Sequence, residues 1–324
     1  MKNLYVISKH ILYNFGGAEK SILRYISKID IKRKILIGFK NNNKEIVSTE
    51  KTEIEFIKPF VNLSKLYFFE YFLNKKVVHQ KVEKLNNSHI ITYGIYFPLV
   101  VNSSKNCFTE LHIRSETDLG IFINYNLGIR YFIKEILKGI EFPFQYFYMK
   151  ELKEAILNAD KIVCNSMFIQ KKLLKIYGRK SIVVYPQVNI NKENFKNTKE
   201  GIVFIGDSRI KGLNLVKKIA SKLPENDFFI FGRNTHVEKR IGNIIYCPWQ
   251  TDVLKIYKRA KLVIVPSLWQ EAYGRVAKES IILDIPVLVS NVGGLAEAVD
   301  FDESKLVTNY TNSDEWIRKI KDII

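Results

Sequence analysis

The sequence has few cysteines, no long apolar run and a shortage of acidic residues. The three cysteines among 324 residues are far apart and in apolar contexts. Their number and spacing argue against a disulfide framework or a zinc site and favour a reducing compartment. No apolar run approaches the roughly 20 residues that span a bilayer, and the opening MKNLYVISKH is typical of a first strand rather than a signal peptide. We therefore expect a cytoplasmic protein.

Acidic residues number 33 against 51 lysines and arginines, which gives a net charge of +18. Residues 1–200 carry 33 basic against 18 acidic side chains, a net +15, and residues 201–324 carry 18 against 15, a net +3. A basic front part predicts an anionic partner: nucleic acid, an acidic membrane surface or a phosphorylated substrate. The alternative is that the Lys-, Asn- and Ile-rich usage reflects a biased genome composition.

Short apolar runs alternate with amphipathic stretches along the whole chain. One such stretch, residues 168–178, places Phe168, Leu173, Leu174 and Tyr177 near one stripe and ends at Gly178, a favourable helix C-cap. Alternation of this kind predicts parallel sheets with helices on both faces. The predicted strands span residues 3–8, 33–39, 54–60, 89–95, 105–112, 160–166, 181–186, 201–206, 227–232, 243–248, 261–267 and 285–290.

The polar stretch 189–200 has the composition of a linker or surface loop. We therefore predict α/β architecture with two Rossmann-like, doubly wound domains that face each other across a cleft. Residues 1–188 form the N-terminal domain and residues 189–311 the C-terminal domain. Residues 312–324 form a terminal helix that can pack back toward the N-terminal domain. Ligands are expected at the carboxyl ends of the strands, near the cleft.

Two aromatic, basic stretches break the alternation. Residues 122–150 and 61–78 are rich in aromatic side chains and contain few acids. Each can supply buried helices of the front domain, or an amphipathic element that lies on a membrane or receives a lipid-linked acceptor.

The stretch QEAYGRVAKES, residues 270–280, places two glutamates eight positions apart around a glycine turn that follows an apolar strand. The start of a helix at Gly274 offers free backbone amides, through about Val276, to a phosphate. Carboxylates repel phosphate, so Glu271 and Glu279 are better suited to accept hydrogen bonds from hydroxyl groups on either side of a diphosphate. A nucleotide sugar has that arrangement. The alternative is two solvated glutamates on a helix face.

Two other loops could contribute to the same site. FIGDSRIKG, residues 204–212, follows a strand, and its Gly206 permits a tight turn while Arg209 and Lys211 could reach a diphosphate. Near the N-terminus, Gly16 and Gly17 lie between a predicted strand and a predicted helix, where a backbone without side chains can approach a phosphate closely. No G-x-G-x-x-G fingerprint of a nicotinamide enzyme is present.

These motifs together resemble glycosyltransferase family 4, the group 1 glycosyltransferases. The segments that match are GGAE (16–19), IGDSRIKGL (205–213), the E-x7-E element from Glu271 to Glu279, and PVLVSNVGGLAEAV (286–299). The match is nearly complete in the C-terminal domain and sparse in the N-terminal domain. It implies a GT-B fold and retaining, metal-independent transfer of a hexose-type sugar from a nucleotide-diphosphate sugar, with no cofactor. The implied acceptor is a glycan, a lipid-linked molecule or a protein.

The resemblance also implies roles for individual residues. Glu271 would bind the donor sugar, Glu279 the ribose, and Arg209 and Lys211 the diphosphate. His112, in TELHIRSE, falls where the family often has a donor-contacting histidine. The remaining residues predicted to contact the donor are Gly16, Gly17, Gly206, Tyr273, Gly274, Arg275 and Val276.

Some residues depart from the family pattern. Asp207 replaces the usual arginine after the glycine, the segment before Lys211 is one residue short, and Arg275 stands where the family has an apolar or small residue. The DFD at residues 300–302 resembles a metal-binding motif, but its place near the C-terminal segment predicts a surface position. A catalytically inert GT-B scaffold and a nucleic-acid-binding protein are the alternatives, although no nucleic-acid motif is present.

Overall fold

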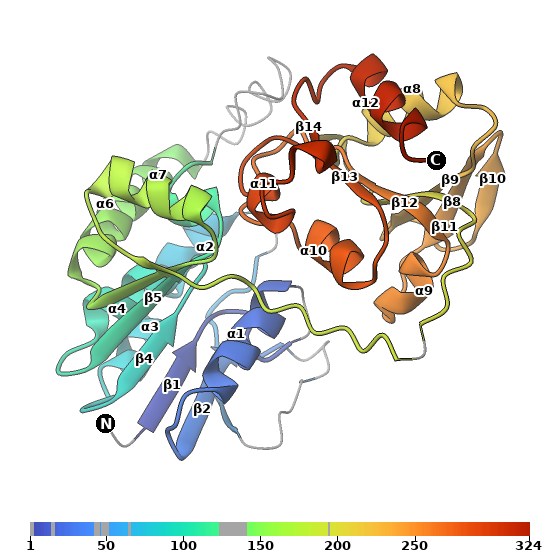
Figure 1. Cartoon of the computed structure of the whole chain (residues 1–324). Helices are drawn as coiled ribbons and strands as arrows, with labels where there is room; N and C mark the ends of the chain where they lie inside the picture. The colour runs from blue at the N-terminus through green and yellow to red at the C-terminus, as the bar shows by residue number, and fades with distance from the viewer. Residues whose placement is uncertain are drawn as a thin grey trace. The chain divides into compact units, whose positions relative to one another are not determined.

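The computed structural model describes residues 3–13, 17–41, 46, 52–63, 66–122, 141–193 and 195–324. The chain divides into two compact units (Figure 1): within the described residues unit 1 ends at Gln187 and unit 2 begins at Val188. The predicted pair of Rossmann-like α/β domains is confirmed, because each unit is built on a seven-stranded sheet.

The sheet of unit 1 is parallel throughout, in the order β3-β2-β1-β4-β5-β6-β7. This order reverses at β1 and β4, as in doubly wound nucleotide-binding folds. Its strands are β1 (Asn3–Ile7), β2 (Arg33–Phe39), β3 (Glu53–Ile57), β4 (His89–Thr92), β5 (Phe108–Ile113), β6 (Lys161–Cys164) and β7 (Ile182–Val183).

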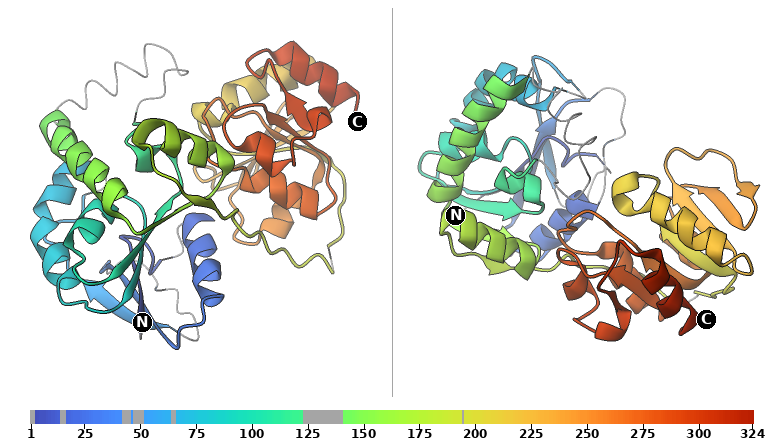
Figure 2. Two further views of the ribbon diagram at one scale, coloured as in Figure 1. Left: turned by 60° about the vertical axis from the view of Figure 1, so that its left-hand side comes forward. Right: turned by 90° about the horizontal axis from the view of Figure 1, so that it is seen from above.

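Helices cover both faces of this sheet. α1 packs with Ile22 and Ile26 against Leu4 and Val6 of β1, and Figure 2 shows α3, α4 and α6 on the opposite side. α7 ends at Gly178, whose φ of +68° is the left-handed C-cap that the sequence predicts. The helices are α1 (Gly17–Ser27), α2 (Tyr67–Leu73), α3 (Lys75–Val82), α4 (Phe97–Ser103), the short η1 (Glu116–Leu119), α6 (Phe142–Asn158) and α7 (Met167–Tyr177).

The predicted stripe of α7 is only partly right: Leu173 is buried, but the stripe leaves out the buried Ile169 and includes the exposed Leu174. Ile169 and Leu173 form its buried face, whereas Leu174 is 52% exposed. Leu174 lies one position past Leu173, and a step of about 100° per residue turns it away from the sheet.

The sheet of unit 2 has the order β10-β11-β9-β8-β12-β13-β14 and is parallel except for β10, which runs antiparallel to β11 at one edge. Its strands are β8 (Gly201–Ile205), β9 (Phe228–Gly232), β10 (Lys239–Ile241), β11 (Ile244–Pro248), β12 (Ala260–Val265), β13 (Val287–Ser290) and β14 (Leu306–Val307).

Alternation along β8 explains why unit 2 has two apolar cores. Ile202 and Phe204 pack on the α8 and α12 side, while Val203 packs on the side of α9, α10 and α11. Trp316 and Ile320 of the terminal helix are fully buried in the first of these cores. The helices are α8 (Leu213–Lys222), α9 (Val253–Tyr257), α10 (Arg275–Ile282), α11 (Leu295–Ala298), α12 (Ser313–Lys321) and the short η4 (Arg209–Lys211) and η5 (Glu303–Lys305).

No helix among the described residues is long and apolar enough to span a membrane.

Candidate functional site

Three loops meet at the carboxyl ends of β8, β12 and β13 in unit 2. The loop after β8 joins the loop after β12 through a hydrogen bond from the Leu268 amide to the Ile210 carbonyl, 2.9 Å. The loop after β13 joins it through the Gly294 amide, which donates to the Glu271 carbonyl at 2.7 Å. The backbone that carries Glu271 is therefore held from both sides.

Glycines allow these loops to approach so closely. Gly212 has a φ of +93°, and a Cβ there would lie 2.0 Å from the carbonyl oxygen of Pro266. Gly293 has a φ of +62°, and a Cβ there would lie 2.5 Å from the carbonyl oxygen of Glu271. Both conditions disfavour any residue with a side chain, so these glycines fix the position of Glu271.

Glu271 meets Lys211 across the first two loops. Lys211 Nζ donates to Glu271 Oε1, which also accepts from Ser267 Oγ at 2.9 Å. Within the described residues no hydrogen bond reaches Glu271 Oε2, and the side chains of Glu271 and Lys211 are 18% and 40% exposed. The pair is thus preformed, and both members retain hydrogen-bonding capacity toward a ligand.

Glu279 is the more buried of the two motif glutamates, at 7% exposure. Its carboxylate accepts from the Tyr257 hydroxyl at 2.7 Å and from Arg275 Nη2 at 2.9 Å. Burial, together with the nearby Glu279 carboxylate, raises the pKa of Tyr257 well above its ordinary value, so the hydroxyl keeps its proton. Arg275, which the family pattern leaves unexplained, is the ion-pair partner of Glu279 one helical turn away.

The first turn of α10 begins where the sequence predicts. Gly274 is its N-cap, and glycine has no side chain that could cap the first amides of the helix, including that of Val276. A Cβ on Gly274 would lie 2.7 Å from Leu295 Cδ2. The close approach of α11 thus requires this glycine independently of any ligand. Tyr273 is buried in the apolar core of unit 2.

Asp207, in the loop after β8, stands where the family has an arginine, and its contacts explain this difference. Its Oδ2 accepts from the Asn234 amide at 3.0 Å and from Asn234 Nδ2 at 2.8 Å, which ties the ends of β8 and β9 together. Gly206 turns the chain next to Lys211, and a Cβ there would lie 3.1 Å from Lys211 Cβ. Arg209 is exposed on η4 and forms no ion pair within the described parts of the chain.

In unit 1, Gly17 is the first residue of α1, whereas Gly16 lies outside the described residues. His112 lies near the carboxyl end of β5 and lines a small pocket between α1 and the strand ends, together with Ser21, Tyr25, Arg114, Val184, Tyr185 and Gln187. His112 is 2% exposed, and its ring meets the edge of Tyr25 at 4.8 Å.

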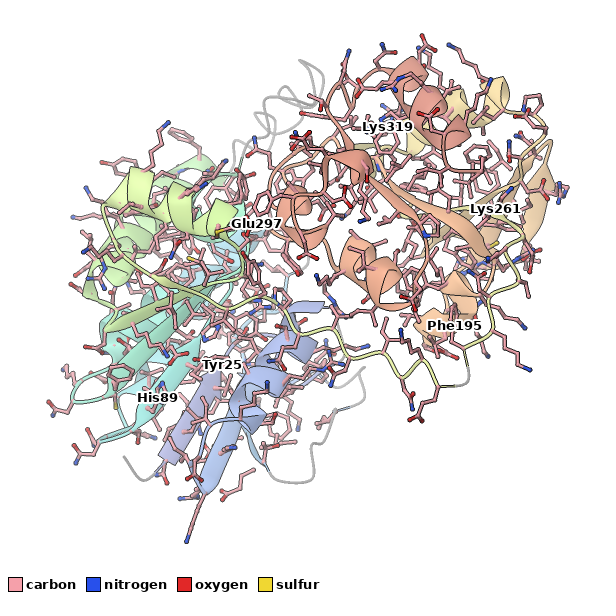
Figure 3. The ribbon with its side chains drawn as sticks, viewed as in Figure 1. Tyr25, His89, Phe195, Lys261, Glu297 and Lys319 are labelled. Carbon is pink, nitrogen blue, oxygen red and sulfur yellow. The ribbon has the colours of Figure 1, made fainter. Side chains whose placement is uncertain are left out.

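Glu110 holds His112 in place from within the sheet. Its carboxylate is fully buried and lies 2.8 Å from His112 Nε2, 3.2 Å from His89 Nε2 and 3.0 Å from Lys161 Nζ. Tyr25 and His89, both labelled in Figure 3, approach it from α1 and β4. Because the strands β4, β5 and β6 are neighbours, the sheet itself assembles this cluster.

The pKa shifts define the protonation of this pair. Burial raises the pKa of Glu110, but hydrogen bonds from His112 and His89 outweigh it and hold the pKa well below its ordinary range. Burial lowers the pKa of His112, partly offset by Glu110. A neutral His112 that donates its Nε2–H to an ionised Glu110 satisfies both shifts and leaves Nδ1 as the acceptor.

The sequence interpretation missed several of these residues. Glu110 and His112 are two positions apart on a strand, so they share a face, and that spacing could have revealed the pair. Ser267 lies four residues before Glu271 on the same loop. Tyr257 lies 22 residues before Glu279, and no local pattern connects them. No group of three or more His, Cys, Asp or Glu among the residues with assigned positions could hold a metal ion.

The chain is similar to known proteins in sequence and in fold. Residues 186–324 match the family model described as glycosyl transferases group 1. An uncharacterised glycosyltransferase of Methanocaldococcus jannaschii is 26% identical over 211 residues, which cover 59% of this chain. The match spans only 55% of that relative's length.

Solved structures resemble the whole chain in fold. Sucrose-phosphate synthase from Thermosynechococcus elongatus superposes with a TM-score of 0.73 at 14% identity, covering 100% of this chain and 90% of that one. HepE of Anabaena, in complex with UDP and glucose, gives 0.67 at 16% identity, covering 99% and 89%. These similarities confirm the predicted GT-B fold class, while the assignment to family 4 stays a prediction.

Proposed function

We propose that the chain is a retaining glycosyltransferase that moves a hexose-type sugar from a nucleotide-diphosphate sugar to a glycan, lipid-linked or protein acceptor. The observation that carries this proposal is the Lys211–Glu271 pair at the joined loops of unit 2, beside the uncapped start of α10. A cation, free amides and a carboxylate with an available oxygen suit a ligand that has negative charge next to hydroxyl groups.

The diphosphate would be held by positive charge and by backbone amides. Lys211 and the exposed Arg209 would supply the charge. The backbone at Gly206 and at the start of α10, Gly274 to Val276, would approach the diphosphate closely. As the bond between sugar and diphosphate breaks, negative charge grows on the departing oxygen, and a preorganised Lys211 stabilises it more than it stabilises the intact donor. These side chains and amides would supply the stabilisation without a metal ion or cofactor.

The two glutamates would bind the hydroxyl groups. Glu271 has an oxygen available for the donor sugar, and Glu279 has two of its roughly four acceptor positions filled by Tyr257 and Arg275, so ribose hydroxyls can still bond to it. In this proposal Arg275 acts through Glu279 rather than on the phosphates.

In unit 1, His112 would accept a hydrogen bond from a ligand hydroxyl through Nδ1, and Gly17, the first residue of α1, would offer backbone to a phosphate. Tyr273 is buried, so its part in donor binding would be to support the turn before α10.

A cytoplasmic location is part of the proposal. Cys107, Cys164 and Cys247 are all free thiols, which supports a reducing compartment.

The test is a binding panel with UDP, GDP, ADP and their sugars, read by thermal shift and calorimetry. One nucleotide family should raise the unfolding midpoint by mass action. Lys211→Met should weaken binding of the diphosphate about tenfold or more, as expected for the loss of one charge-assisted hydrogen bond. Lys222→Met is the matched control, because Lys222 pairs with Asp314 at the far end of α8.

The panel also distinguishes the proposed function from its alternatives. Unchanged diphosphate binding in Lys211→Met would contradict the placement of the site. Donor binding without sugar transfer or hydrolysis, for every acceptor tried, would favour the inert scaffold instead.

A further inference from the structure

The exposed face of α6 in unit 1 carries large aromatic side chains that are not part of the core of that unit. Phe142, Tyr146 and Phe147 are 70%, 67% and 55% exposed, whereas Tyr148, Leu152 and Ile156 already fill the core. Residues 142 and 146 are one helical turn apart, so their rings share one side of the helix, and the Phe147 ring extends this exposed surface because it contacts Tyr146 at 5.7 Å. Three large exposed aromatic rings on one helix face are unusual for a surface that contacts only water.

The aromatic face continues onto α2. Phe69 and Phe72 contact Phe144 with ring centroids 5.2 and 5.8 Å apart, and Phe72 contacts Phe147 at 6.5 Å. Tyr146 contacts Phe147 at 5.7 Å. Five rings are therefore connected across the two helices. Together with Phe142, one turn before Tyr146, they make up what we call the α2–α6 aromatic surface: Phe69, Phe72, Phe142, Phe144, Tyr146 and Phe147.

The helix cannot rotate to bury these rings. One helical turn after Phe147, Glu151 accepts from the Tyr71 hydroxyl at 2.7 Å and from Lys75 Nζ at 2.5 Å. Tyr71 is itself fully buried. These bonds and the buried Tyr148 and Leu152 fix which side of α6 faces outward.

Lysines border the α2–α6 aromatic surface. Lys75 Nζ lies 5.9 Å from the centre of the Phe72 ring, and the exposed Lys150 follows Tyr146 by one helical turn. Lys153 is exposed one turn farther along. Of the nearby acids on α6, Glu151 is neutralised by Lys75, which leaves Glu154 exposed. The surface therefore combines apolar rings with a net positive border.

We propose that the α2–α6 aromatic surface binds the headgroup region of an anionic lipid bilayer. Phe and Tyr favour the boundary between headgroups and acyl chains, and lysines next to them are attracted to anionic lipids. The glycosyl transfer proposed above does not require this surface, so the inference goes beyond that function and can fail separately. It selects one of the two alternatives that the composition of 61–78 and 122–150 leaves open.

The experiment is flotation of the full chain with vesicles of phosphatidylcholine alone or with 30% phosphatidylglycerol. Binding should require the anionic lipid and weaken with salt. The triple variant Phe142→Ser, Tyr146→Ser, Phe147→Ser should lose flotation. The matched control is Val237→Ser with Ile241→Ser, which removes exposed apolar side chains from unit 2. Lys150→Ala with Lys153→Ala should weaken partitioning roughly 25-fold, about fivefold per lysine.

All variants change exposed side chains, so their unfolding midpoints should match that of the wild type, and nucleotide binding checks that unit 2 is intact. Wild-type protein that fails to float with anionic vesicles overturns the proposal. Flotation that survives the triple variant also overturns it. A self-associated chain that the triple variant converts to monomers, without vesicle binding, would assign the surface to a second copy instead.

Discussion

Replacing Arg275 by methionine tests how the two motif glutamates work. Arg275 Nη2 lies 2.9 Å from Glu279 Oε1, one turn along α10, and the side chains are 29% and 9% exposed. Methionine keeps most of the length and helix propensity but removes the charge. Among the described residues, the Glu279 carboxylate would then accept a hydrogen bond only from Tyr257.

The size of the effect follows from this partial burial. Removing one partner of a fully buried ion pair costs about 3–5 kcal/mol, whereas an exposed pair on a helix contributes about 0.3–0.5 kcal/mol. For a buried carboxylate with a partly exposed arginine we expect a loss of about 1–2 kcal/mol in the free energy of unfolding. If Glu279 binds ribose, its loss of orientation should weaken nucleotide binding by a similar amount, roughly 5- to 30-fold.

The assay compares the nucleoside and the nucleoside diphosphate of the base that binds. Arg275→Met should weaken both by the same factor, because the ribose is common to both ligands. Lys211→Met should weaken only the diphosphate. A loss in Arg275→Met that is confined to the diphosphate would show that Arg275 contacts phosphate, and would refute the assignment of Glu279 as its functional partner.

Three further predictions concern the framework of each unit. Glu110→Ala should lower kcat about tenfold more than Glu110→Gln, because only glutamine keeps an acceptor for His112 Nε2–H, a hydrogen bond of about 1.4 kcal/mol; equal rates would make Glu110 purely structural. Gly212→Ala should cost at least about 2 kcal/mol more in urea unfolding than Gly178→Ala, because both have a positive φ but only Gly212 meets a backbone carbonyl. The urea midpoint should fall as the pH drops below the ordinary histidine pKa of 6.5, because burial lowers the pKa of His112 and the unfolded chain takes up the proton first. His112→Asn should reduce that fall. The corresponding loss in the free energy of unfolding should become smaller by about 1.4 kcal/mol for each unit of pKa lowering.

Much of the fold could be predicted because its strands are continuous apolar runs. β8, β12 and β13 are buried on both faces, and helices with one apolar face separate them, so period and length identify each element. The edge strand β10, in contrast, has three exposed residues and no apolar alternation, and no run in the sequence indicates it.

The candidate site could be predicted only in part. Glu271, Glu279 and the start of α10 form one local pattern, and Lys211 follows a strand at a predictable loop. The contacts that orient them depend on the tertiary structure: Tyr257 reaches Glu279 from α9, and Gly294 bonds to Glu271 from the loop after β13. The family pattern does not account for Arg275. The ion pair with Glu279, four residues away, does, but the motif by itself indicates only a ligand as the partner of Glu279.

The role of Glu271 is the central claim, and turnover of the donor found in the binding panel tests it most directly. Glu271→Gln keeps the size of the side chain and can still bond to Lys211 and Ser267, but it loses the negative charge that sugar hydroxyls and the reacting centre would meet. The account predicts that kcat falls at least about 100-fold while the affinity for the nucleoside diphosphate stays within about threefold of the wild type. Wild-type turnover in Glu271→Gln, with an intact fold, would contradict it.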